Sequence, residues 1–172
     1  MTEIRDVRRL PRLGQVAIVA GPAGLRALSF VGAGDTVLDA PAGRTDLTSA
    51  AFAQVVEYLA GTRRSFALPL DLTGFSPFTD LVMAACARIP WGATATYRAV
   101  ATAIGQPGAV RAVGGALGRN PLPIIIPCHR VLACGGLGGY TPGVDLKRVL
   151  LAIEGHPDDA ASIASAAAIP AN

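Results

Sequence analysis

The alternation and clustering of apolar positions predict a chain of mixed α and β structure. Apolar residues on both sides of the turn Gly21-Pro22-Ala23-Gly24 predict two strands over 15–20 and 25–30. Later apolar residues recur every three or four positions, which is typical of amphipathic helices. The pattern predicts helices from Asp46 or Thr48 to about 59, and then over 78–89, 97–104, 109–118 and 145–153.

Side-chain types at the helix starts and faces refine this prediction. Asp46 or Thr48, Ser76 and Thr96 can cap the first three helices, and Pro77 suits a first helical turn. The apolar stripe of the first helix is expected to contain Phe52, Val55, Val56 and Leu59, and that of the second Phe78, Leu81, Val82 and Ala85.

A change of character near Gly74 predicts two domains in an α+β protein. Residues 1–74 are expected to form a small sheet with a helix, and residues 75–172 a helical domain with a flexible tail over 157–172. The helices at 97–104 and 109–118, separated by a glycine-containing turn, form a candidate helix-turn-helix. Most such pairs are ordinary helix packing, so the pattern alone leaves DNA binding open.

Charge is distributed unevenly along the chain. Residues 1–85 carry 8 basic and 8 acidic side chains, residues 86–150 carry 7 basic and one acidic, and residues 151–172 carry three acids and no base. The segment 86–150 therefore has a net charge of +6 and resembles an anion-binding surface. All but one of the 15 basic residues are arginine, which is consistent with codon bias and carries no functional weight by itself.

Composition excludes some classes of protein. The mean hydropathy is high at +0.44, but the chain has 32 alanines and its longest uncharged run, 131–144, has 14 residues. A membrane-spanning helix needs roughly 20 apolar residues, so we expect none. The charged start predicts no secretory signal, and three cysteines form no even disulfide set, which favours a cytoplasmic location.

Adjacent Cys128 and His129 are the sharpest chemical feature. A thiol becomes a nucleophile as thiolate, and an imidazole within reach can accept its proton. Glu154 is the best candidate to orient the imidazole, because it is the only acid between Asp145 and Asp158. The alternative is a buried structural cysteine beside a surface histidine. The cysteine and histidine spacings match no zinc pattern, so no metal is expected.

The residues around Cys128 carry a family resemblance. Pro127-Cys128-His129-Arg130-Val131, preceded by Asn120-Pro-Leu-Pro and followed by Gly139-Tyr140, resembles the active-site signature of O6-alkylguanine-DNA alkyltransferases. The resemblance extends through Pro90-Trp91-Gly92, Thr96-Tyr97, Arg111-Ala-Val-Gly-Gly115 and Glu154-Gly155, covering about residues 76–156, and is looser in the N-terminal part.

The resemblance implies a function and a role for each matched residue. The expected function is DNA repair: one irreversible transfer of the alkyl group of O6-alkylguanine, with O4-alkylthymine as a further candidate lesion, to Cys128 after base flipping. His129 would act as base through a water, Glu154 would hold it, and Tyr97 would donate to the leaving guanine. Asn120 would organise the turn beneath Cys128, and Arg130 would form a structural salt bridge. The pocket would be formed by Tyr140, Leu117, the carbonyls of Cys128 and Val131, and the Thr141 amide.

The same resemblance implies a DNA interface and a fold. The helix-turn-helix would lie in the minor groove of double-stranded DNA, and Arg111 would fill the place of the flipped base. Small residues would let the helix approach the groove: Ala109, Ala112, Gly114 and Gly115. The implied fold is a ribonuclease H-like N-terminal domain followed by a winged-helix-like catalytic domain. A monomer without cofactor is expected, and without zinc, since residues 1–85 contain neither Cys nor His.

Two other functions remain to be weighed. A non-enzymatic damage sensor could share this fold, but such relatives lack the reactive cysteine that Cys128 supplies. A cysteine hydrolase could use Cys128, His129 and Glu154, but it would need an oxyanion hole and repeated turnover. It would also leave Arg111 and the basic segment unexplained.

Overall fold

The computed structural model describes residues 2–32, 40–156 and 169 of the 172. The chain divides into two compact units, Met1–Thr73 and Gly74–Asn172. Each unit has its own secondary structure, and the expected mixture of a small sheet with helices is confirmed. Most of the predicted tail, and much of the loop expected before the first helix, lies outside the described residues.

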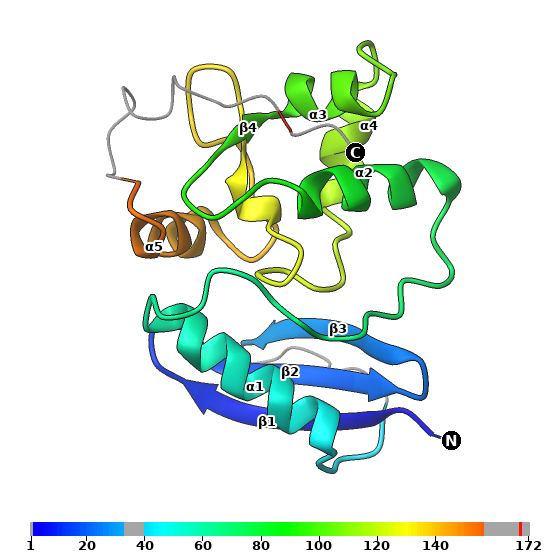
Figure 1. Cartoon of the computed structure of the whole chain (residues 1–172), viewed down its shortest axis with the longest axis vertical. Coiled ribbons are helices and arrows are strands. Elements are labelled where there is room, and N and C mark those ends of the chain that lie inside the picture. Colours follow the sequence, from blue (N-terminus) through cyan, green and yellow to red (C-terminus); the bar gives the residue numbers. More distant parts are fainter. Residues whose placement is uncertain (1, 33–39, 157–168, 170–172) are drawn as a thin grey trace. The chain divides into compact units, whose positions relative to one another are not determined.

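The first unit is a three-stranded antiparallel sheet with one helix (Figure 1). Its strands β1 (Ile4–Leu10), β2 (Gly14–Gly21) and β3 (Gly24–Val31) pair in chain order, and α1 (Asp46–Leu59) packs against them. The run from Val16 to Ala20 in the central strand is buried on both faces, as expected for a strand covered on both sides. The two strands predicted from sequence are confirmed, each with one more residue at either end.

Strand β1 is the element of this unit that the sequence pattern did not predict. Four of its seven residues are charged, so it lacks the apolar alternation of a strand. It forms because it pairs with β2 along its whole length, from Ile4 opposite Ala20 to Leu10 opposite Gly14. Its inward-facing Asp6 is only 5% exposed, and it is stabilised by partners described below.

Helix α1 begins at Asp46, the earlier of the two predicted starts, and it buries Phe52 and Val55 as expected, but its N-cap and the rest of its buried stripe differ from the prediction. Thr45 is the N-cap, in a capping box in which Thr45 and Thr48 each accept a hydrogen bond from the other's backbone N–H. The prediction of Asp46 or Thr48 as cap is therefore wrong. Val56 is 44% exposed, so its predicted burial is wrong too. The helix instead buries Thr48, Ala51, Phe52, Val55 and Tyr58.

The second unit is mainly helical. Its elements are α2 (Pro77–Ala87), β4 (Ala95–Thr96), α3 (Tyr97–Ala103), α4 (Val110–Leu117), the 3-10 turn η1 (Cys128–Arg130), β5 (Val131–Leu132) and α5 (Val144–Ile153). The predicted caps Ser76 and Thr96 are confirmed: each hydroxyl accepts a hydrogen bond from a backbone N–H three residues later. Leu81 is 48% exposed on α2, which corrects its predicted burial.

Helix packing in this unit places the chemically interesting segments next to one another. Helices α3 and α4 pack together, α2 contacts both, and α5 packs on η1 (Figure 1). The two-residue strands β4 and β5 pair in parallel, with Ala95 opposite Val131 and Thr96 opposite Leu132. This pairing brings the start of α3 beside the segment that follows Cys128. No helix in the described ranges is long and apolar enough to cross a membrane.

Candidate active site

Cys128 begins η1, and Asn120 shapes the turn that leads to it. The Asn120 amide nitrogen donates to the Ile126 carbonyl at 2.8 Å and to Cys128 Sγ at 3.0 Å, while its oxygen accepts from the Leu122 N–H. Ile124, in the same turn, is buried with φ of +75°, a left-handed conformation that costs a β-branched residue about 1–2 kcal/mol. The three hydrogen bonds of Asn120 thus hold this turn and place its amide nitrogen against the thiol.

The groups around the Cys128 thiol have opposing effects on its pKa. Burial raises its pKa, whereas the hydrogen bond from Asn120, the charge of Lys147 and a hydrogen bond from Tyr140 lower it. Burial prevails, so the resting thiol is protonated at neutral pH. A base must therefore remove its proton before the sulfur can act as a nucleophile.

His129 and Glu154 form a buried pair with Arg130. His129 Nε2 lies 2.8 Å from Glu154 Oε1, and the Arg130 guanidinium donates to both carboxylate oxygens, at 2.8 and 2.9 Å. Arg130 also donates to the Ile89 carbonyl at 2.6 Å, and the Gly92 N–H approaches Glu154 Oε2 at 3.4 Å. Every polar group of the Glu154 side chain is thus engaged, and the expected Arg130 salt bridge is confirmed.

The charge state of this pair fixes the tautomer of His129. Burial alone would raise the Glu154 pKa, but hydrogen bonds from His129 and Arg130, and their charges, lower it to about 2. Burial also lowers the His129 pKa, so that the ring is neutral near pH 7. An ionised carboxylate only accepts hydrogen bonds, so Nε2 must carry the ring proton. Nδ1 is then the basic nitrogen of the ring.

Lys147 lies beside Cys128 in the structure, and the sequence analysis did not single it out. It is fully buried, and its Nζ donates to the carbonyls of Val131 at 2.7 Å, Leu137 at 2.6 Å and Gly139 at 3.3 Å. Burial lowers its pKa to about 8, although the nearby thiols of Cys128 and Cys86 raise it in part. It was detectable in principle, because it is the only lysine in a chain that uses arginine at its 14 other basic positions.

Tyr97 holds the loop after Cys128 from the other side. Its hydroxyl donates to the Gly139 carbonyl at 3.2 Å. A Cβ on Gly138, where φ is +70°, would lie 3.0 Å from the ring, so only glycine allows this approach. Burial, followed by the negative charge of Cys128, raises the Tyr97 pKa and keeps the hydroxyl a donor.

The other residues predicted for the pocket lie around the same loop. Leu117 and Val131 are buried, and Tyr140 is half-buried. The Val131 carbonyl accepts from Lys147, and the Cys128 carbonyl accepts from the Val131 N–H. Thr141 is exposed, and its hydroxyl donates to the Gly118 carbonyl at 3.0 Å.

The residues predicted to face DNA lie on or beside α4. Arg111, Ala112 and Gly115 are exposed, and Ala109 is the N-cap. Gly114 is half-buried, and a Cβ there would be 3.9 Å from the Tyr97 ring, so Gly114 faces α3 more than solvent. Within the described ranges, no three His, Cys, Asp or Glu side chains are grouped so that they could hold a metal ion, and Cys86, Cys128 and Cys134 are free thiols.

Comparison with known proteins identifies the family. Residues 77–156 match the family model of the 6-O-methylguanine DNA methyltransferase, DNA binding domain. A methylated-DNA–protein-cysteine methyltransferase of Methanosarcina barkeri is 39% identical over 146 residues, which are 83% of this chain and 91% of that protein. The chain belongs to the methylated-DNA–protein-cysteine methyltransferase family.

Other relatives agree over shorter or longer spans. A methyltransferase of the same description from Mycolicibacterium paratuberculosis is 50% identical over 109 residues, which are 60% of this chain and just 66% of that relative. The crystal structure of the Mycobacterium tuberculosis O6-methylguanine methyltransferase superposes with a TM-score of 0.79 at 34% identity, covering 94% of this chain and 99% of that one. A structure of the M. tuberculosis OGT in complex with DNA has a TM-score of 0.76 at 37% identity, with coverage of 88% and 92%.

Proposed function

We propose that this chain repairs DNA by moving the alkyl group of O6-alkylguanine to Cys128, once and irreversibly. The observation that carries the proposal is the buried cluster in which Asn120 donates to the Cys128 sulfur while the next residue, His129, pairs with Glu154. The relatives named as methylated-DNA–protein-cysteine methyltransferases support it. O4-alkylthymine, which carries its alkyl group on an equivalent exocyclic oxygen, is a second candidate lesion.

The proposed reaction is a displacement at the alkyl carbon. The Cys128 proton passes to Nδ1 of His129 through a water, and Glu154 stabilises the resulting imidazolium through Nε2. The thiolate forms the S–C bond as the bond from that carbon to O6 breaks, leaving its electron pair on guanine. Tyr97 turns its hydroxyl from Gly139 to the base and offsets this negative charge, and the guanine then takes up one proton.

Irreversibility follows from the product. A thioether has no electrophilic centre that water attacks readily, and no second base is proposed to release the alkyl group. Lys147 supports the step by attracting the thiolate and by fixing the Val131 and Leu137 carbonyls. In this mechanism Tyr140, Leu117, Val131 and Thr141 form the pocket.

DNA binding is proposed through α3 and α4. The DNA complex of the M. tuberculosis relative supports it, as do the exposed positions of Arg111, Ala112 and Gly115. We place α4 in the minor groove, where small residues allow a close approach, and Arg111 in the gap left by the flipped base. Ala109 and Gly114 border this surface and contribute by their small size.

The remaining expectations are part of the same proposal. The first domain, residues 1–74, is assigned to the ribonuclease H-like class, and the second, residues 75–172, to a winged-helix-like class. The similarity to the M. tuberculosis structure over 94% of the chain supports these assignments. We propose a cytoplasmic monomer that needs no cofactor or metal.

Mass spectrometry of the intact protein tests the function. After mixing with an oligonucleotide that contains O6-methylguanine, the wild type should gain one methyl group, located on Cys128, and then stop. Cys128→Ala should gain none and still bind the oligonucleotide. An unchanged wild-type mass would indicate a damage sensor, and repeated turnover on an ester or amide would favour a cysteine hydrolase.

A further inference from the structure

The seven basic residues of the segment 86–150 fall into two groups by their partners. Arg130 and Lys147 are buried with the contacts described above, Arg148 pairs with Asp145 at 3.2 Å, and Arg88 is engaged as well. In the part of the chain that the structure describes, the guanidinium groups of the other three form no hydrogen bond or ion pair. These three are Arg98, Arg111 and Arg119.

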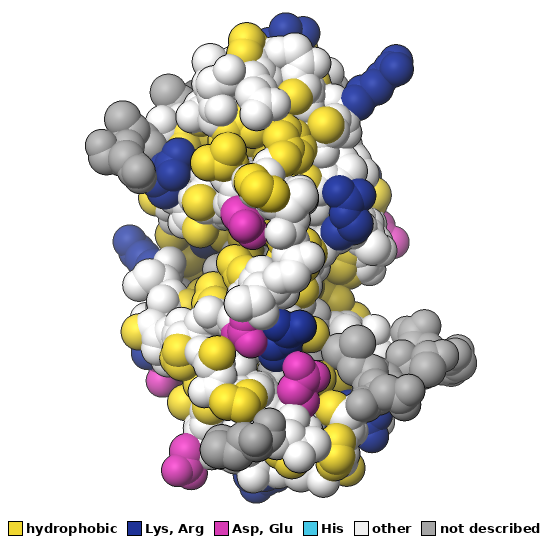
Figure 2. Space-filling view, turned by 90° about the vertical axis from the view of Figure 1, so that its right-hand side faces the viewer, with side chains coloured by type: hydrophobic (Ala, Val, Ile, Leu, Met, Phe, Trp, Pro, Cys, Tyr) yellow, Lys and Arg dark blue, Asp and Glu magenta, His cyan; other side chains and the backbone are white. Residues whose placement is uncertain are grey.

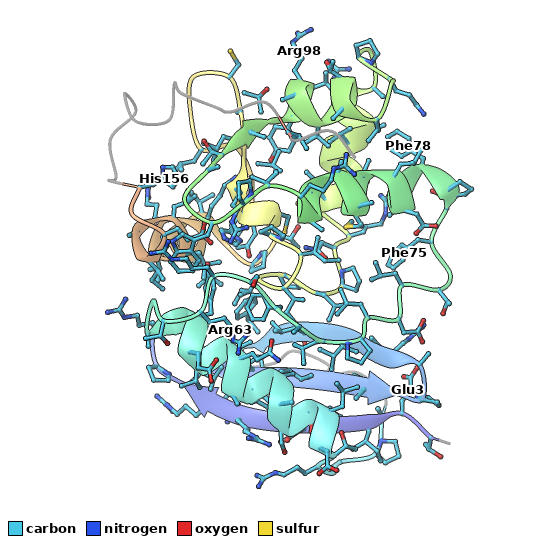
Figure 3. All side chains as sticks on the ribbon, in the orientation of Figure 1. Glu3, Arg63, Phe75, Phe78, Arg98 and His156 are labelled. Carbon is cyan, nitrogen blue, oxygen red and sulfur yellow. The ribbon has the colours of Figure 1, made fainter. Side chains whose placement is uncertain are left out.

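All three unpaired arginines belong to the α3–α4 pair. Arg98 is the second residue of α3 and is exposed, and Figure 3 shows its side chain directed away from the helix. Arg111 is the second residue of α4, and Arg119 follows the C-cap Gly118. The Tyr97 ring, 3.9 Å from a Cβ placed on Gly114, brings the start of α3 beside the middle of α4.

Arg119 lies on the face of α4 that carries Arg111. Its Nη1 lies 3.7 Å from the position of a Cβ on Gly115, so the guanidinium reaches back along the helix over that glycine. Residues 111 and 115 are one turn apart, which places the Arg119 charge roughly 5–6 Å along the axis from the start of the Arg111 side chain.

These three like charges have no acidic partner nearby in the sequence. The chain has no Asp or Glu between Asp80 and Asp145, so no acid within that stretch offsets them. On the face drawn in Figure 2, Lys and Arg side chains are scattered among uncharged ones and form no continuous patch. What distinguishes these arginines is therefore their lack of partners and their shared location, which suit a polyanion.

We propose that Arg98 and Arg119 each bind one backbone phosphate of the DNA beside the position that Arg111 enters. This inference rests on the proposed function for the orientation of α4. The minor groove is only about 6 Å wide, so the Arg119 guanidinium, about one helical turn from Arg111, lies at the wall of the groove, where the phosphates are. Arg98 is exposed on α3, which packs beside α4, and we place it against a phosphate on this neighbouring helix. Phosphate contacts of this kind set register and affinity without reading sequence.

Salt dependence of binding to an undamaged duplex measures such contacts directly. Each phosphate contact adds about 0.9 to the slope of log K against log salt. Arg98→Ala and Arg119→Ala should each reduce the slope by about 0.9, and the double variant by about 1.8. When the salt concentration rises from 50 to 200 mM, the factor by which affinity falls should be about 3.5 times smaller in each single variant than in the wild type.

Matched controls separate contact from net charge. Arg148→Ala removes the same charge from an exposed position of α5 and should leave the slope unchanged. Arg119→Lys keeps a charge that can reach a phosphate and should keep the slope. Slopes for Arg98→Ala and Arg119→Ala that equal the Arg148→Ala slope would overturn the inference.

Methyl transfer from the free base distinguishes this inference from the proposed function. Both alanine variants should accept a methyl group from free O6-methylguanine at the wild-type rate, because no phosphate is present. If the wild type accepts no methyl group from base or duplex while the slopes change as stated, the phosphate contacts stand and the proposed reaction fails. A variant that transfers slowly from the free base contradicts a role confined to phosphate binding.

Discussion

Among the residues that the structure describes, each unit has one buried carboxylate held by arginine, and the two differ in what else they touch. In the first unit Asp6 is 5% exposed and accepts from Arg8 at 2.6 Å and from the Thr48 hydroxyl at 3.1 Å. In the second unit Glu154 is equally buried and accepts from Arg130 and His129. Only the second carboxylate has a partner that titrates near neutral pH.

This difference separates a structural carboxylate from a candidate catalytic one. Burial by itself would raise the Asp6 pKa. Hydrogen bonds from Arg8 and Thr48 and the charges of Arg8 and Arg44 together outweigh burial, so the pKa is lowered overall. Asp6 therefore remains ionised and ties β1 to α1, with Arg8 stacked 4.5 Å over the Phe52 ring. Burial and an arginine partner are thus common to both carboxylates. What makes Glu154 the catalytic candidate is its hydrogen bond to His129, the residue next to Cys128.

Neutralising the two carboxylates should give the largest contrast. Glu154→Gln should slow single-turnover methyl transfer about 100-fold or more, because the imidazolium loses its counter-charge. It should also lower the free energy of unfolding by about 3–5 kcal/mol, since Arg130 stays buried without its ion pair. Asp6→Asn should lower it by about 2 kcal/mol and leave the transfer rate unchanged. Quench-flow assays and urea titrations measure both; a slow Asp6→Asn variant would contradict the comparison.

Acid should affect activity and stability in different pH ranges. The neutral His129 ring is the base and its pKa is lowered from 6.5, so transfer should fall about tenfold per unit once the pH is below that lowered pKa. The Glu154 pKa is lowered from 4.5 to about 2, so its contribution to stability is complete above pH 4.5 and is lost as the pH falls toward 2. The Asp6 pKa is also lowered from 3.8, so its contribution to stability is likewise lost as the pH falls below 3.8. In Glu154→Gln, acid unfolding should depend less on pH over the range 2–4.5.

Removing one cation from each unit should slow methyl transfer about tenfold in the second unit and leave it unchanged in the first. Lys147→Met removes the ammonium that attracts the thiolate and that binds the Val131 and Leu137 carbonyls. Loss of the ammonium should raise the Cys128 pKa further. The expected result is a transfer that is about tenfold slower, which corresponds to about 1.4 kcal/mol. Arg8→Met, the control in the first unit, should leave the rate unchanged. Equal rates for wild type and Lys147→Met would exclude a role for Lys147 in the reaction.

A pair of glycines should give the smallest effect on the reaction. In Gly138→Ala the new Cβ meets the Tyr97 ring at 3.0 Å and should slow transfer a few-fold by displacing the hydroxyl donor. In Gly24→Ala the Cβ meets the Pro69 carbonyl oxygen at 2.6 Å, and the backbone there cannot easily move. This variant should lose about 1–3 kcal/mol of stability with no change in rate. Thermal unfolding and transfer assays on both variants measure these outcomes. Slower transfer in Gly24→Ala and an unchanged rate in Gly138→Ala would contradict the comparison.

Local features of the sequence predicted what depends on neighbours within three or four residues. Ser76 and Thr96 were recognisable as caps because the N–H groups that they accept from belong to Thr79 and Ala99. The two apolar strands were predictable from their own residues and the turn between them. The Cys128–His129 pair and its family signature are contiguous, so the sequence alone indicated the candidate chemistry.

The tertiary structure alone decided which polar residues are buried and with whom. Asp6 meets Thr48 across 42 positions, Arg130 meets the Ile89 carbonyl across 41, and Lys147 meets the Val131 carbonyl across 16. Neither hydropathy nor helical period predicts such burial, because a charge enters the interior only where distant partners offset its loss of hydration. The helical period likewise did not predict that Val56 and Leu81 remain exposed despite their apolar character. The sequence by itself thus determined the helices, the two apolar strands and the candidate cysteine, whereas the fold determined the strand β1 and the charges that surround that cysteine.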